Sequence, residues 1–247
     1  MKTSVSILLT LVVFVTTTAA KPVPDVAAVA AGNTKFALKL YDQLNDEKGN
    51  LFLSPYSIST ALAMTYAGAR GETEAEMAKA LQFPLFPDKE GGPLGRERLH
   101  AGFSGLKLGL REAQKKGDVQ LSIANALWPQ KNYRFLPEYL NLIERDYDSV
   151  GRPLDYSNSE KARGIINRWV EQETNDKIKD LIPSGVLDSL TRMVLTNAIY
   201  FKGNWDVQFK EKSTREMPFK VTPTNLVKTP MMYQKGNFGY YQDEDVQ

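Results

Sequence analysis

The 247-residue sequence contains no cysteine and only one histidine, His100. Without thiols the chain cannot form disulfide bonds, zinc fingers or iron–sulfur centres, and it has no cysteine nucleophile. A single histidine also excludes a metal site built on two histidines. An excess of one charge is missing too, because 31 Lys and Arg against 29 Asp and Glu leave a net charge of +2. That balance gives no indication of nucleic-acid binding. With 42% hydrophobic and 24% charged residues, the composition is that of an ordinary globular domain.

Long apolar runs are absent except at the N-terminus. Residues Met1–Ala20 combine an early lysine, an apolar stretch at Ile7–Val15 and small residues just before Lys21. This pattern is typical of a secretory signal peptide, and the apolar stretch is short for a membrane span; an uncleaved anchor helix is the alternative. We therefore predict a signal peptide over 1–20, a single mature domain over 21–247 and a secreted, extracellular protein, or a periplasmic one in a bacterium.

Hydrophobic spacing predicts helices first and strands later in the chain. The predicted helices are Val26–Leu44, Ser54–Ala67, Thr73–Leu81, Arg96–Lys116, Leu136–Asp146 and Ser159–Lys179, and the predicted strands are Asn50–Leu53, Val119–Ile123, Met193–Phe201, Ser213–Phe219, Leu226–Met232 and Phe238–Gln242. Capping boxes are predicted at Thr73 with Glu76 and at Ser157 with Glu160. Because strands and helices do not alternate regularly, the order indicates an α+β fold.

Two segments are predicted to be central. No charged residue occurs between Leu51 and Ala69, so the helix after Ser54 must be surrounded by protein. Met193–Phe201 is almost wholly apolar, which predicts a strand buried on both faces.

His100 is the one residue that could serve a Ser-His-Asp hydrolase. It lies on the predicted helix Arg96–Lys116, opposite the apolar stripe, so we expect it to be exposed to solvent. No Gly-x-Ser-x-Gly elbow, phosphate-binding glycine loop or metal-binding spacing occurs in the sequence. We expect no enzymatic activity, no metal and no cofactor.

Several long motifs resemble those of the serpins, the serine protease inhibitor family. They are Asn50–Met64, Gly68–Thr73, Asn197–Trp205 with Phe209, Thr214 and Phe219 beyond it, and Pro230–Met232. The resemblance runs from about Val29 to Gln247. It implies helices A–F packed on a large, mainly antiparallel central sheet, plus a second sheet. It also implies an incomplete C-terminus, because a serpin continues past Gln247 with the hinge, the reactive-centre loop and the last strands, so the reactive bond is not among these residues.

The resemblance implies a secreted inhibitor of serine proteases, with cysteine proteases as an alternative target. A protease would attack the exposed loop as a suicide substrate, and the cut loop would then insert as a new strand into the central sheet. Two alternatives stay open. The protein is a non-inhibitory serpin that serves as carrier, chaperone or storage protein, or the 247-residue chain is an inert truncated fragment.

Three residues match the serpin shutter, the region beneath the sheet that lets its strands part. Ser54 and Ser57 match the start of the buried helix, and Asn197 matches their partner on the central strand. The family's histidine in this cluster belongs to the missing part. The alternative is that Ser54 only caps its helix and Asn197 is a hydrogen-bonded core residue.

Two further sets of residues are implied by the resemblance. Lys202, Gly203 and Trp205 match the breach, where the loop first enters; read without the family, they are a strand-ending turn and a core anchor. Lys107, Arg111 and Lys115 form a basic edge on the segment that matches helix D, which binds heparin-like polyanions in some serpins. The alternative there is a solvated basic stripe, interrupted by Glu112.

Overall fold

A computed structural model describes residues 25–45, 49–84, 86, 94–115, 119–149, 151–237 and 239–243. The predicted signal peptide lies outside these residues, so its prediction is untested. Within the described ranges, no helix is long and apolar enough to cross a membrane.

The described elements are helices in the first part of the chain and mostly strands in the last part. The α-helices are α1 Val26–Leu44, α2 Pro55–Tyr66, α3 Gly71–Ala80, α4 Leu94–Gln114, α5 Pro137–Tyr147 and α6 Ser159–Glu173, with short 3-10 turns η1 Tyr156–Asn158 and η2 Glu211–Ser213. The strands are β1 Val119–Pro129, β2 Met193–Gly203, β3 Arg215–Thr222 and β4 Asn225–Met231. The predicted α+β class is confirmed.

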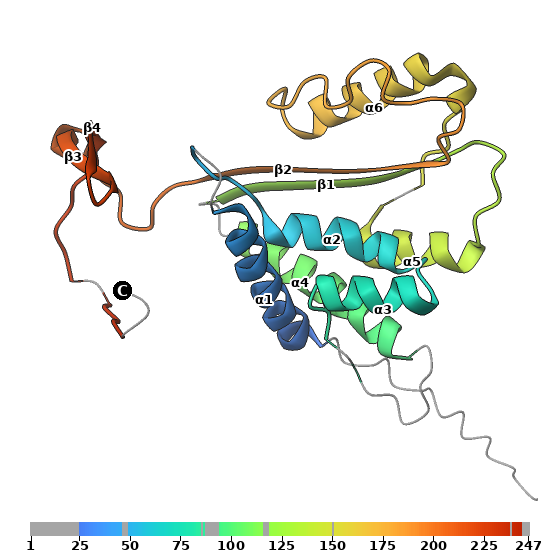
Figure 1. The fold of residues 1–247 in the computed structure, drawn as a ribbon, viewed down its shortest axis with the longest axis horizontal. Helices are drawn as coiled ribbons and strands as arrows, with labels where there is room; N and C mark the ends of the chain where they lie inside the picture. The colour runs from blue at the N-terminus through green and yellow to red at the C-terminus, as the bar shows by residue number, and fades with distance from the viewer. Residues whose placement is uncertain are drawn as a thin grey trace, which may run out of the picture.

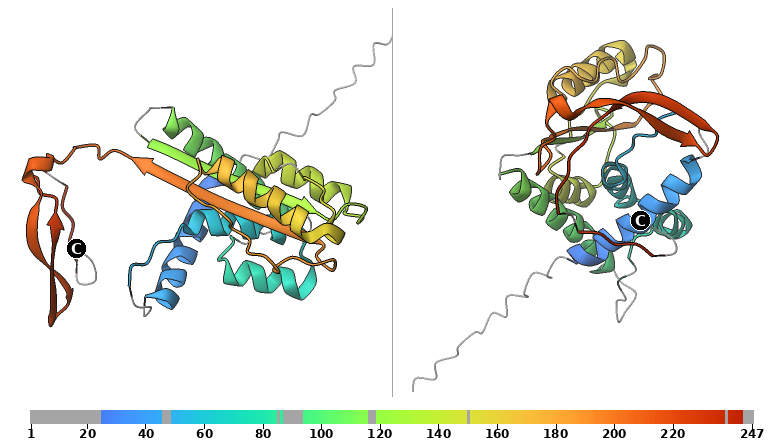
Figure 2. Two further views of the ribbon diagram at one scale, coloured as in Figure 1. Left: turned by 90° about the horizontal axis from the view of Figure 1, so that it is seen from above. Right: turned by 90° about the vertical axis from the view of Figure 1, so that its left-hand side faces the viewer.

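A long antiparallel ribbon of β1 and β2 divides the molecule into two layers (Figure 1). The helices α1 to α5 lie on one side of this ribbon, and α6 lies along the other face. The register places Asn125 opposite Asn197 near the middle of the two strands. Strands β3 and β4 form a separate antiparallel hairpin that projects from the end of β2 (Figure 2). This arrangement leaves the centre of the ribbon covered on both sides.

Each face of the ribbon has its own core, because successive side chains on a strand point to opposite faces. Leu127 packs with the helical layer, in a cluster that includes Met64 of α2 and Ile143 of α5. The neighbouring Trp128 packs with Ile166 of α6 on the other face. The uncharged helix α2 is therefore central, as predicted, between the ribbon and the outer helices.

The prediction that Met193–Phe201 is buried on both faces is only partly correct. Within it, Thr196 and Ala198 are buried, whereas the strand is exposed from Phe201 onward. Among the described residues β2 pairs with β1 alone, so its other edge and its C-terminal end are uncovered. An apolar sequence shows that a strand can be buried on both faces, but the covering layers must come from elsewhere in the chain.

Several local predictions are wrong. Asn50–Leu53 is not a strand, and neither are the described residues of Phe238–Gln242, because no neighbouring strand pairs with them. The helix α3 begins at Gly71, so Thr73 lies inside it and does not cap it. At the start of α6, the cap is Asn158, whose side chain accepts a hydrogen bond from the Lys161 amide at 3.2 Å.

The predicted exposure of His100 is also wrong. Its side chain is fully buried, and Nδ1 lies 2.6 Å from the hydroxyl of Tyr147. The ring also packs near Tyr66 of α2. The apolar stripe identified in the sequence covers one side of α4, but α5 packs against another side and buries His100 there. Burial lowers the pKa of His100 to about 4, although the charge of Asp146 partly opposes this shift.

We predict that His100 makes the fold sensitive to mild acid. The unfolded chain takes up this proton near the ordinary pKa of 6.5, while the folded protein takes it up only near 4. The free energy of unfolding should therefore fall as the pH drops from 6.5 toward 4, by roughly 3 kcal/mol for this group. In His100→Gln, urea unfolding between pH 7 and pH 4 should show a shallower loss of stability. Parallel pH profiles for the two proteins would contradict this assignment.

Candidate functional site

A polar contact joins α2 to both strands of the ribbon. The Ser57 hydroxyl donates to Oδ1 of Asn197, and Nδ2 of Asn197 donates to Oδ1 of Asn125 at 2.5 Å. Ser57 itself is 1% exposed. Ser54 is the N-cap of α2, and its hydroxyl oxygen accepts from the Ser57 amide at 3.4 Å. Of the predicted shutter residues, the structure brings Ser57 and Asn197 into direct contact and places Ser54 next to them.

Asn125 is the member of this cluster that the sequence interpretation missed. It stands on β1 directly across from Asn197 in the register. A sequence signal was present, because Leu121, Ile123 and Leu127 alternate on the face toward the helices and Asn125 interrupts them. A polar residue at an apolar position of an alternating strand indicates a buried hydrogen bond.

The predicted breach residues lie at the exposed C-terminal end of β2. Lys202 and Gly203 end the strand, opposite the start of β1. Trp205 is 63% exposed and stacks edge-on against Phe209, with ring centroids 5.6 Å apart. Trp205 therefore belongs to neither described core, and the role of these residues in loop entry stays a prediction.

The three cations of the predicted polyanion site already face carboxylates. Lys107 and Arg111 bind the two oxygens of Asp148 at 2.9 and 2.7 Å, and Lys115 pairs with Glu112 at 2.5 Å. Asp148 is held there by the left-handed turn that ends α5. Although burial acts to raise it, the pKa of Asp148 is held below its ordinary value by Lys107 and Arg111. A polyanion would have to compete with Asp148 for two of the three cations.

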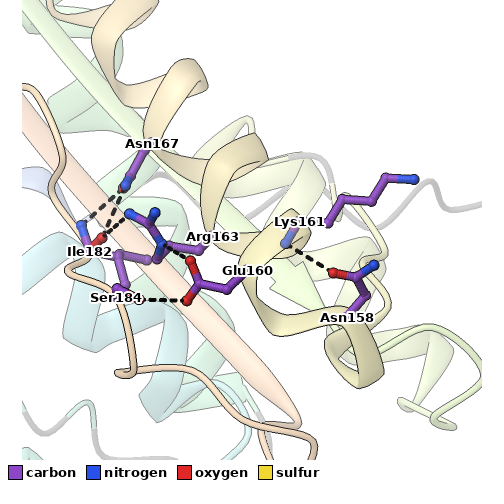
Figure 3. A network of polar contacts seen from close by, with 7 residues as sticks. All are labelled: Asn158, Glu160, Lys161, Arg163, Asn167, Ile182 and Ser184. Carbon is purple, nitrogen blue, oxygen red and sulfur yellow. Dashed lines mark hydrogen bonds and ion pairs between the residues drawn. The ribbon is translucent and has the colours of Figure 1, made fainter.

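Helix α6 is bonded to the segment that follows it (Figure 3). The Asn167 amide makes two hydrogen bonds to the backbone of Ile182, donating at 3.0 Å and accepting at 2.9 Å. Arg163 donates to the same carbonyl, and Ser184 donates to Glu160 at 3.0 Å. The predicted helix Ser159–Lys179 ends early, at Glu173, and the chain then returns along α6.

The contact between α6 and the ribbon has a different character. Trp169 of α6 meets Trp128 of β1 edge to face, with ring centroids 5.4 Å apart. The guanidinium of Arg152 lies near both rings, at 5.7 Å and 5.6 Å from their centroids. Within the described part of the chain, no hydrogen bond joins α6 to β1 or β2. The helix is therefore held to the sheet by packing and to its own return segment by polar bonds.

Comparison with known proteins places this arrangement in a family. Residues 31–247 of this chain match the sequence model of a protein family that is described as serpin (serine protease inhibitor). The chain is a serpin. The resemblance inferred from the sequence motifs is thus confirmed, and so is the predicted incomplete serpin-like fold.

Relatives of this serpin include protease inhibitors. It is 40% identical over 220 residues to the leukocyte elastase inhibitor of Sus scrofa and 38% identical over 222 residues to that of Homo sapiens. These matches cover 87% and 88% of this chain, respectively, but 55% of each relative. The chain therefore spans about half the length of the curated relatives it matches.

Solved structures with the same fold include ovalbumins. Emu ovalbumin superposes with a TM-score of 0.75 at 33% identity, over 85% of this chain and 55% of that one. A cleaved ovalbumin mutant described as loop-inserted has a TM-score of 0.69 at 31% identity, over 84% and 55% of the two chains. Serpins as a family are protease inhibitors.

Among the described residues of this chain, no group of side chains that could hold a metal ion occurs.

We predict that Asn197 is the strongest point of the polar cluster. Asn197→Ala leaves the Ser57 hydroxyl and the Asn125 amide short of a partner and should lower the free energy of unfolding by about 1–3 kcal/mol in urea titrations. Asn204→Ala is the matched control, because Asn204 is exposed just beyond the strand and its loss should change stability by less than about 0.5 kcal/mol. Equal effects of the two substitutions would show that the cluster contributes nothing.

For the basic edge of α4, we predict that Asp148 limits polyanion binding. Asp148→Asn keeps a residue that tolerates the left-handed turn but frees Lys107 and Arg111, so the protein should elute from heparin–agarose at higher salt. Asp206→Asn removes the same charge from an exposed loop and serves as control. If the two variants elute together, the pairing with Asp148 does not limit binding.

Proposed function

We propose that the whole protein, of which these residues form part, is a secreted inhibitor of a serine protease that acts as a suicide substrate. The observation that carries this proposal is the match to the serine protease inhibitor family over residues 31–247, with relatives named leukocyte elastase inhibitor. In this proposal the protein is no enzyme in its own right, because the protease supplies the catalytic serine. Secretion rests on the predicted signal peptide over 1–20.

The state of β2 supports a loop-insertion mechanism. Among the described residues β2 pairs with β1 alone, and in this proposal the reactive loop of the whole protein becomes a new strand of the same sheet beside β2. After a protease has formed an ester with the reactive loop, insertion of that loop beside β2 would carry the protease along and distort its active site. That the ovalbumin fold accommodates such an insertion agrees with this proposal.

The two layers around the ribbon also support the mechanism. Asn197, Ser57 and Asn125 hold the two strands to α2 by hydrogen bonds that can re-form after the strands move. On the opposite face α6 is held to the sheet by ring packing. In this proposal, sheet expansion shifts the apolar contacts between α6 and the sheet, while the polar cluster on the other face re-forms its hydrogen bonds after the strands have moved.

We predict that the full-length protein forms a covalent adduct with a serine protease and that residues 1–247 alone do not. Full-length protein and the 247-residue chain would each be mixed with leukocyte elastase, trypsin, chymotrypsin and subtilisin, and the products separated on SDS gels. An SDS-resistant adduct should form with at least one protease and the full-length protein. A protease whose active-site serine is replaced by alanine is the control, because it cannot form the ester.

Two results would overturn this proposal. If the full-length protein is cleaved in the reactive loop without an adduct, it is a non-inhibitory serpin, and a carrier, chaperone or storage role replaces inhibition. If the 247-residue chain forms the adduct, the reacting bond lies within these residues and the assigned position of the reactive loop is wrong.

A further inference from the structure

A cavity of about 680 Å³ lies on the helical side of the molecule, away from the ribbon's free edge. It is open to solvent and is bordered by the C-terminal end of α2, the first turns of α4, and α5 with the segment before it. None of the predicted shutter, breach or polyanion residues lines it. Any ligand held there would act through residues that the protease-inhibition mechanism leaves unused.

The rim of the cavity carries an excess of positive charge. Four arginines and two glutamates line it: Arg70, Arg96, Arg134, Arg145, Glu97 and Glu138. Arg145 is bound to both oxygens of Asp146, and Arg96 pairs with Glu74 at 3.4 Å. These two guanidinium groups are therefore committed to acidic residues of the protein.

The other two arginines have no acidic partner among the residues that the structure describes. Arg70 donates only to the backbone carbonyls of Ala67 and Ala69, at 3.0 and 2.6 Å. Arg134 makes no hydrogen bond or ion pair with any residue that the structure describes. Guanidinium groups bind carboxylates and similar anions through paired donors, so two such groups on one cavity favour an anionic ligand.

The wall below this rim is apolar. Tyr139, Leu142 and Met193 line the cavity and are each partly buried. Among the described residues, the hydrogen-bond partner of the Tyr139 hydroxyl is the Met193 sulfur, at 3.9 Å. A thioether sulfur is a weak acceptor. Burial raises the pKa of Tyr139 to about 12, so the hydroxyl keeps its proton and can donate to a ligand. A cavity with a cationic rim and an apolar wall suits a molecule with an acidic head and an apolar body.

His100 borders the same cavity, although its side chain is itself fully buried. If the Tyr147 hydroxyl donates to Nδ1, only the Nε2–H is left without a partner among the described residues; the opposite arrangement leaves both Nε2 and the phenolic hydrogen unsatisfied. The first arrangement is therefore favoured, and the neutral ring at the edge of the cavity carries its hydrogen on Nε2.

We propose that this cavity binds a small organic anion with a carboxylate head and an apolar chain, with Arg70 and Arg134 at the head group and with Tyr139, Leu142 and Met193 along the apolar chain. The inference does not depend on the proposed inhibitory activity, because the cavity lies at the C-terminal end of α2, whereas the polar cluster at Asn197 meets the N-terminal end of α2. A protein that fails to trap a protease could still bind such an anion here.

The test uses decanoate as the probe and full-length protein at pH 7.4, measured by isothermal titration calorimetry. We expect saturable binding at one site, with decanol weaker and acetate without measurable binding. Arg134→Ala and Arg70→Ala should each weaken decanoate binding about tenfold, as the loss of one charge-assisted contact predicts. Arg168→Ala, on the exposed face of α6, is the matched control and should bind as the parent does.

The single histidine gives a direct readout of the site. In protein labelled with ¹⁵N-histidine, decanoate should shift the Nε2 resonance of His100, and the shift should saturate with the calorimetric affinity. No binding, binding without a shift at His100, or equal affinities for Arg134→Ala and Arg168→Ala would each overturn the proposal. Unchanged thermal melting of the arginine variants would show that weaker binding does not arise from unfolding.

Discussion

The side-chain amide of Asn197 uses its acceptor and its donor to hold three elements together. Its oxygen accepts from Ser57 on α2, and its nitrogen donates to Asn125 on β1. A partly buried amide between strands and a helix costs free energy unless both of its functions are used, so these two hydrogen bonds favour the observed position of α2 beneath the ribbon. Helices α1, α3 and α5 pack against α2, and the Tyr66 side chain of α2 also hydrogen-bonds Glu74 of α3.

The sequence was most informative where one element carries its own signal. The lack of charge around α2 can be seen in one short segment, and the central position predicted from it is correct. His100 was placed wrongly because its burial depends on α5, which lies far along the chain and adds a second covered side to α4. Asn125 was missed for a similar reason, since its importance depends on a strand partner that periodicity does not identify.

The functional residues, like the fold, could be predicted where the signal lies within one segment and could not where it depends on contacts between distant segments. The serpin motifs lie within single segments, and the family could be recognised from them. The ion pairs of Asp148 with Lys107 and Arg111 join α4 to the end of α5, so the sequence alone indicated a basic edge without its counter-charge. The cavity between α2, α4 and α5 likewise could not be predicted, because its arginines come from two helices and from two connecting segments that are distant in the sequence.

One polar group at the contact between α6 and the sheet has no hydrogen-bond partner among the described residues. The indole N–H of Trp169, the ring that meets Trp128, is buried without an acceptor. A buried donor without an acceptor lowers the stability of the folded protein by about 1–3 kcal/mol. If α6 moved away from the sheet, water could accept a hydrogen bond from this N–H. Detachment of α6 from the sheet thus exposes apolar surface but relieves a desolvated dipole. Because two hydrogen bonds join Asn167 of α6 to the backbone of Ile182, the helix and its return segment would move away from the sheet together.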